Sequence, residues 1–259
     1  MKQSAIKKHP IEVTLYRNAT MRIKHFGIHI LTDPMLSDKA TFMSFVTPEQ
    51  NLNPTVDLPM PLDRIIEGID MVLISHLHPD HFDAKAMEVL PKTLPIVCSK
   101  DDSNAIKEMG FIEVIGIEDS TTWRGIRFTK TGGKHGVDEL KDQLGEVVGF
   151  VLEAPGYETL YWVGDCILDN QIRKNIHKYN PKIIITHSGG AIYLGEHQIL
   201  MNGDDTIEIA KQVPDAKIIA VHLDALDHCL ESRTTLKTKV KEQEVKNIYI
   251  PLDGQKLTL

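Results

Sequence analysis

The residues that follow the apolar run Met71–Ile74 constrain this chain more than any other part of its sequence. Three histidines and one aspartate fall within six positions there. In an extended chain the first two histidines point to the same side and can bind one ion, whereas a turn can direct the aspartate and the last histidine toward a second ion. Chance surface histidines are the less favoured explanation of so dense a cluster. The candidate ligands are His76, His78, Asp80 and His81.

Apolar periodicity on both sides of this cluster indicates an α/β fold. Strand patterns at the start give way to alternating strands and helices, and the same succession begins again near residue 125, so two facing sheets with helices outside are expected. The irregular segment 34–61 is a candidate lid with exposed-looking apolar residues, among them Met35 and Phe45, and 1–259 is expected to form a single domain. Strands are expected at 11–17, 21–26, 28–32, 71–74, 95–98, 125–131, 147–153, 159–163, 182–186 and 217–221, and helices at 83–90, 101–109, 168–179, 204–212 and 231–241.

Composition excludes several classes of protein. A formal net charge of −7 argues against broad binding to nucleic-acid phosphates, which requires a basic face. Three widely spaced cysteines give neither a disulfide framework nor a thiolate zinc site. The basic N-terminal segment Met1–Pro10 lacks a following apolar region, and no later run is long enough to span a membrane. The sequence therefore predicts a cytoplasmic protein without a membrane span.

The segment Ser75-His-Leu-His-Pro-Asp-His-Phe82 resembles the signature of the metallo-β-lactamase superfamily. That resemblance implies a four-layer αββα sandwich. Further markers of the family follow strand-like runs in the expected chain order, and we expect them to complete the site. They are Asp33 in Leu-Thr-Asp-Pro, His135 in Thr-Gly-Gly-Lys-His-Gly, Asp165 in Tyr-Trp-Val-Gly-Asp-Cys, and His222 in Ala-Val-His-Leu-Asp.

The resemblance implies two divalent ions. Zinc suits the ligand types, and Mn²⁺ or Fe²⁺ tolerates the same set. A hydroxide that bridges the ions would attack the substrate, while Asp80 would orient the hydroxide and later carry a proton toward the leaving group. Asp33 would support the metal loop from behind. The implied ligands are His76, His78 and His135 for one ion, Asp80, His81 and His222 for the other, and Asp165 for both.

Several other side chains are candidates for an outer position or for substrate contact. His187 also ends a strand-like run and competes with His222 as the last ligand, although its place in the chain order favours a supporting or substrate-side role. For the rest, a structural or exposed side chain is an equally good interpretation. These further candidates are His197, Asp224 and His228.

The function class follows from one position in the motif. Redox di-iron members of the superfamily have glutamate where this chain has His78, so hydrolysis is favoured over oxygen or nitric oxide reduction. Elements such as Met201-Asn-Gly-Asp-Asp205 resemble the branch that contains L-ascorbate-6-phosphate lactonase and N-acyl-phosphatidylethanolamine phospholipase D. We expect a small ester, lactone or related molecule as substrate. A lipid or nucleotide phosphodiesterase and a non-catalytic metal-binding protein are the alternatives, and self-association into a homo-oligomer stays open.

Overall fold

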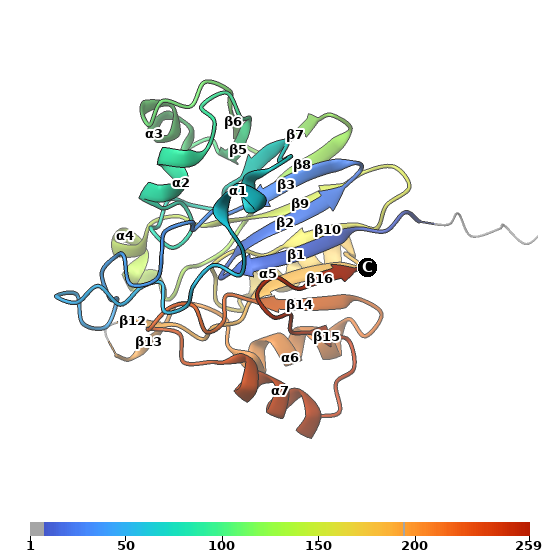
Figure 1. Cartoon of the computed structure of the whole chain (residues 1–259). Helices are drawn as coiled ribbons and strands as arrows, with labels where there is room; N and C mark the ends of the chain where they lie inside the picture. Colours follow the sequence, from blue (N-terminus) through green and yellow to red (C-terminus); the bar gives the residue numbers. More distant parts are fainter. Residues whose placement is uncertain (1–7, 194) are drawn as a thin grey trace, which may run out of the picture.

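The computed structural model of the chain describes residues 8–193 and 195–259, so residues 1–7 of the basic N-terminal segment lie outside it. Within those ranges the strands form two seven-stranded sheets (Figure 1). The first runs in the order β16 (Lys256–Thr258), β1 (Glu12–Arg17), β2 (Thr20–His25), β3 (Ile28–Thr32), β4 (Met71–Leu73), β5 (Ile96–Ser99) and β6 (Val114–Ile117). The second runs in the order β15 (Ile248–Tyr249), β14 (Lys217–Val221), β11 (Ile183–His187), β10 (Leu160–Trp162), β9 (Val148–Glu153), β8 (Ile126–Gly132) and β7 (Ser120–Trp123).

Helices lie outside each sheet, as Figure 1 shows for α2 and α3 on one side and for α6 and α7 on the other. A further small sheet joins β12 (Ile192–Tyr193) to β13 (His197–Gln198). The helices are α1 (Leu62–Ile66), α2 (Ala84–Val89), α3 (Ser103–Glu108), α4 (Lys141–Leu144), α5 (Asn170–Tyr179), α6 (Gly203–Gln212) and α7 (Arg233–Glu242), with a 3₁₀ turn at Asp138–Leu140.

Three apolar layers hold the elements together. The central layer joins inward-facing side chains of both sheets, such as Ile23 of β2 and Phe128 of β8. A second layer packs α2 and α3 against the first sheet, and a third packs α5 and α6 against the second sheet. Because both faces of each sheet are covered, many strands are buried on both sides and their sequences are continuously apolar. The expected four-layer αββα sandwich is confirmed.

The structure corrects several expected boundaries. The helix expected from residue 168 begins at Asn170, because the side chain of Asp169 accepts a hydrogen bond from Ile172 N at 2.9 Å and caps the first turn. The helix expected from residue 231 begins at Arg233 after the cap residue Ser232. Several short elements were not predicted from the apolar pattern, because they are only two to five residues long and depend on contacts with other parts of the chain. They are α1, α4, β6, β7, β12, β13, β15 and β16.

The lid candidate 34–61 is irregular in the structure, with a single bridge between Phe42 and Asn53 as its pairing. Met35 was expected to be exposed, but it is fully buried against Ala225 and Leu226. Met43, in contrast, is 47% exposed. The start of the segment is thus part of the core, and only its middle reaches solvent. No helix among the described residues is long and apolar enough to cross a membrane.

Candidate metal centre

The predicted ligands follow the ends of four strands, at one edge of the two sheets. The motif of residues 75–82 follows β4, His135 follows β8, Asp165 follows β10, and His222 follows β14. In the second sheet β8 and β10 both pair antiparallel with β9, while β11 pairs parallel with both β10 and β14, so β8, β10 and β14 run in one direction. The carboxyl ends of strands that run in one direction meet at one edge of a sheet, which is where α/β proteins gather their functional loops.

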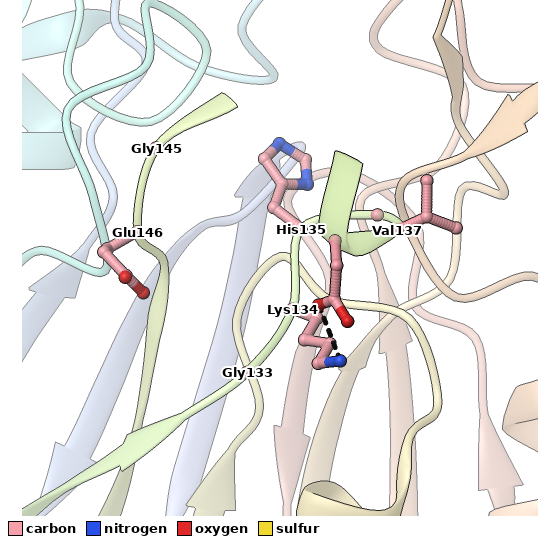
Figure 2. A pocket seen from close by; sticks show the side chains of 8 residues that line it. Gly133, Lys134, His135, Val137, Gly145 and Glu146 are labelled. Atoms are coloured by element: carbon pink, nitrogen blue, oxygen red, sulfur yellow. Dashed lines mark ion pairs between the residues drawn. The ribbon is translucent and has the colours of Figure 1, made fainter. Parts of the chain in front are cut away.

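The first cluster consists of His76, His78 and His135. One nitrogen from each ring lies within 4.8 Å of the others, and His76 Nε2 is 3.0 Å from His78 Nδ1. His135 Nδ1 lies 2.9 Å from Ile199 O, so Nδ1–H donates to that carbonyl and leaves the Nε2 lone pair for a ligand. In Figure 2 the His135 ring points away from the Lys134–Asp138 ion pair.

Burial favours the neutral form of two histidines in this first cluster. It lowers the pKa of His76 well below its usual value, and it also lowers the pKa of His135. Neutral imidazole is the form that binds a metal ion, because the lone pair is then free. Three imidazole rings whose nitrogens lie this close together form a typical nitrogen donor set.

The second cluster consists of Asp80, His81, Asp165 and His222. His81 Nε2 lies 3.2 Å from Asp80 Oδ2 and 3.1 Å from Asp165 Oδ2. His222 Nε2 lies 3.3 Å and 3.5 Å from the same two oxygens. Donor atoms with these separations are close enough together for all four side chains to bind one cation.

The buried carboxylates of the second cluster, Asp80 and Asp165, need positive charge nearby to stay ionised. Burial by itself would raise the pKa values of Asp80 and Asp165, yet the charge of His81 holds both well below their usual range. Burial would likewise lower the pKa of His222, but Asp165 raises it to about 10. Two buried carboxylates therefore keep their charge only where protons or cations compensate for it.

The residues present fit divalent cations. His222 Nε2 is buried and has no hydrogen-bond partner in the part of the chain that the structure describes, although two carboxylate oxygens lie near it. An orphaned ring nitrogen beside two carboxylates suits a metal ligand better than a structural histidine. The first cluster would hold one cation, and the second cluster would hold another.

Asp33 supports the motif from the end of β3. Its carboxylate accepts hydrogen bonds from Ser75 N at 2.8 Å, from Ser75 Oγ at 2.6 Å and from His81 Nδ1 at 2.6 Å. The bond to His81 Nδ1 turns Nε2 of that ring toward the second cluster. Asp33 thus lies where an outer support of the metal loop is expected.

His187 lies behind Asp165. Its Nδ1 donates to Asp165 Oδ1, while its Nε2 accepts a hydrogen bond from Trp162 Nε1 at 2.8 Å. Both ring nitrogens are occupied and the side chain is fully buried, so His187 orients the carboxylate of Asp165 and neither binds an ion nor faces substrate. Of the two candidates for the last ligand, His222 is the one with a free nitrogen.

A cleft of about 380 Å³ opens onto both clusters. His228 lines it, whereas His197 and Asp224 are not among its described lining residues. His197 lies in β13 beside Glu196, and Asp224 binds Arg233 at the start of α7 at 3.0 Å. The lining is Met43, Ser44, Phe45, Pro48, His78, Pro79, Asp80, His135, Gln143, Leu144, Asp165, Ile192, Tyr193, Ile199 and His228.

Comparison with known proteins identifies the family. Residues 29–223 match the model of the beta-lactamase superfamily domain. The chain belongs to the metallo-β-lactamase superfamily. It is 38% identical over 253 residues to UPF0173 protein YddR of Bacillus subtilis (strain 168), covering 96% of this chain and 100% of the relative. Other relatives carry the name UPF0173 metal-dependent hydrolase, and this member of the superfamily is a metal-dependent hydrolase of the same family.

Two solved structures are similar to this chain over nearly its whole length. A protein described as a possible metal-dependent hydrolase from Veillonella parvula DSM 2008 matches with a TM-score of 0.93 and 33% identity, over 97% of this chain and 100% of its own. The isothiocyanate hydrolase from Delia radicum gut bacteria matches with a TM-score of 0.90 and 30% identity, over 96% of this chain and 98% of its own.

A more distant relative in sequence is the N-acyl-phosphatidylethanolamine-hydrolyzing phospholipase D 1 of Caenorhabditis elegans, at 24% identity over 88% of this chain and 69% of its own.

Asn18 is a site residue of this metallo-β-lactamase domain that the sequence analysis missed. Its Nδ2 donates to Asp80 O at 3.0 Å, and its own carbonyl accepts from His222 N at 3.0 Å. It therefore links two ligand-bearing loops, although in the sequence it is an ordinary turn residue between two strands. The Met201–Asp205 element, in contrast, lies at the start of α6, where Asn202 and Asp205 form a capping box.

Proposed function

We propose that this hydrolase uses two divalent cations, one in each cluster, to hydrolyse a small uncharged electrophile that carries an apolar substituent. The observation that supports this most is the lining of the cleft. Among its described residues there is no lysine or arginine, while Phe45, Leu144 and Ile199 supply apolar surface. Its volume of about 380 Å³ suits a small molecule. Esters and lactones fit this description.

The similarity to the isothiocyanate hydrolase, with a TM-score of 0.90, supports a wider class of candidate substrates. An isothiocyanate is also small and uncharged, and it presents an electrophilic carbon beside an apolar group. Water added across its C=N bond gives a thiocarbamic acid, which breaks down to the amine and carbonyl sulfide. We therefore include alkyl and aryl isothiocyanates among the candidate substrates.

The residues of this chain supply orientation and proton handling. Cations bound to the two clusters would lower the pKa of a water molecule toward neutrality and polarise the substrate. Asp80 Oδ2 faces His81 and His222, which leaves Oδ1 to accept a hydrogen bond from the attacking water. Asn18 fixes Asp80 through its backbone carbonyl. The apolar wall around Phe45 holds the substituent and excludes bulk water.

The test is a substrate panel with protein loaded with Zn²⁺, Mn²⁺ or Fe²⁺. Esters, lactones and isothiocyanates are compared with bis-aryl phosphodiesters, and elemental analysis counts the bound ions. We expect two ions per chain and turnover of at least one uncharged class. Replacement of both His78 and Asp80 by alanine should remove turnover and lower the metal content. Two bound ions without turnover of any uncharged substrate would contradict the proposal.

Phosphodiester hydrolysis is the second candidate, favoured by the similarity to the Caenorhabditis elegans phospholipase D. A bound phosphate would gain from a nearby lysine or arginine. Lys134 instead pairs with Asp138 at 2.7 Å, and Arg173 pairs with Glu208. Neither Lys134 nor Arg173 lines the cleft. The phosphodiester arm of the panel decides between the two candidates.

A further inference from the structure

His228 is the one histidine of the cleft lining that belongs to neither metal cluster. It lies in the loop after β14, six residues beyond His222, and shares the lining with Asp80 and Asp165. A role for it in the reaction rests on the hydrolysis proposed above. The tautomer and charge of its ring determine which group it presents to a substrate.

The environment of His228 selects one form of its ring. Nδ1 is buried without a hydrogen-bond partner in residues 8–193 and 195–259. A buried N–H without an acceptor is rarer in proteins than an under-used acceptor, so the proton belongs on Nε2. Burial also lowers the pKa of His228 to about 4, which leaves the ring uncharged at neutral pH. Nε2 is then the donor that can face the cleft.

The lid segment fixes this ring in place. Phe45 meets His228 edge to face, with ring centroids 4.6 Å apart and planes at 76°. Phe45 is itself held by Asp227, whose carboxylate accepts from Phe45 N at 3.2 Å and from Asn53 Nδ2 at 2.9 Å. Ser44 Oγ donates to the same carboxylate. A hydrogen-bond donor that is held in position before substrate binds pays little reorganisation when charge develops beside it.

We propose that His228 is a catalytic residue whose Nε2–H donates a hydrogen bond to the substrate heteroatom on which negative charge develops. In an ester or lactone that atom is the carbonyl oxygen, and in an isothiocyanate it is the nitrogen. Loss of one such donor typically lowers kcat by about 10²–10³. The donor acts beside the cations without binding either of them.

The kinetic test compares His228→Phe with His228→Gln in the metal-loaded enzyme. Phenylalanine keeps the ring contact with Phe45 and removes the donor, so kcat should fall by about 100-fold or more with little change in KM and in metal content. Glutamine restores an N–H and should recover part of the loss. His177→Phe, an exposed substitution on α5, is the matched control. Activity of His228→Phe within threefold of wild type, or loss of a metal ion from it, would overturn the proposal.

An NMR test works even if the substrate class proposed above is wrong. Long-range ¹H–¹⁵N spectra of the metal-loaded wild type should show His228 as the neutral Nε2–H tautomer at pH 7, assigned by its absence from the Gln variant. Added phenylacetate, a small apolar anion, should shift the Nε2 resonance. An Nδ1–H tautomer, a charged ring or an unshifted signal would overturn the role of His228. Lack of turnover in the substrate panel would contradict only the hydrolysis proposal.

Discussion

A single carboxylate can control a metal site without touching the metal, and Asp33 has this position. It is fully buried, and it accepts hydrogen bonds from both Ser75 and His81. The ring of His81 could otherwise rotate and withdraw its Nε2 from the second cluster. His187 likewise fixes the orientation of Asp165, through a hydrogen bond from its Nδ1 to the Asp165 carboxylate. At the residue scale, therefore, much of the metal site depends on side chains that bind no ion.

We expect Asp33→Asn to weaken metal binding by about 10- to 100-fold. A neutral amide with one oxygen is a poorer acceptor for the three donors of Ser75 and His81 than a carboxylate is. Competition with a chromophoric chelator measures this affinity. Asp38→Asn, at an exposed position nearby, is the control and should bind metal like wild type. Equal affinities for the two variants would remove Asp33 from the support of the site.

A second residue-scale effect concerns pH and lies away from the metals. His25 is fully buried and stacks on Tyr157 at 5.0 Å, and burial lowers its pKa to about 4. The unfolded chain, with a histidine pKa of about 6.5, binds more protons between these values, so the stability from neutral His25 is lost as pH falls below 6.5.

His25→Phe keeps the stacking and cannot titrate. Between pH 7.5 and pH 5, the free energy of unfolding of wild type should fall by about 2 kcal/mol more than that of this variant. Urea unfolding curves at the two pH values measure the difference. If the free energy of unfolding fell equally in wild type and variant, the pKa of His25 would not be lowered in the folded protein.

At the scale of elements, the strand ends set the positions of the candidate ligands, and the turn after β10 leaves no room for a side chain. Gly164 has a φ of +79°, and a Cβ there would lie 2.5 Å from Val148 O on the neighbouring strand. Glycine is thus required immediately before Asp165. His222 also adopts a positive φ, of 61°, at the end of β14, which is unusual for a side chain with Cβ and typical of functional positions.

Gly164→Ala should destabilise the fold by about 2–4 kcal/mol and lower metal occupancy, because the backbone must move and Asp165 moves with it. Gly132→Ala, at the end of β8, is the matched control, since its added Cβ meets no atom within 4 Å and its φ is not positive. Thermal unfolding and metal analysis of both variants test this. A stable Gly164→Ala protein with full metal content would refute the steric argument.

At the scale of the whole molecule, the metal centre joins the two sheets. The motif follows a strand of the first sheet, while His135, Asp165 and His222 follow strands of the second. Cations bound to both sets of side chains would tie the two halves together, in addition to the apolar layer between the sheets. Self-association into a homo-oligomer stays open, and size-exclusion measurements would test it.

Removal of the metals should lower the melting temperature. With free cation at about 1,000 times Kd, binding contributes about 4 kcal/mol, which corresponds to a shift of about 8–16 °C for a chain of this size. Thermal scans with and without chelator measure the shift. The His78→Ala/Asp80→Ala variant should respond much less to added cation. Identical melting of the holoprotein and the chelated protein would exclude a structural contribution from the metals.

The sequence alone determined the parts of this protein that are encoded locally. Strand periodicity and the dense cluster of residues 76–81 are properties of short segments, and they predicted the layers and the first candidate ligands. The later ligands His135, Asp165 and His222 were accessible only through resemblance to a family, because each is a single residue after a strand.

Tertiary structure decided what depends on distant contacts. Asn18 and Trp162 gain their roles from neighbours 62 and 25 residues away, and the burial of Met35 depends on the loop after β14. His187 and His222 have the same local pattern, a histidine after an apolar strand. Only the hydrogen bonds of the folded chain distinguish them: both nitrogens of His187 are occupied, whereas Nε2 of His222 has no partner among the described residues, which makes His222 the candidate metal ligand.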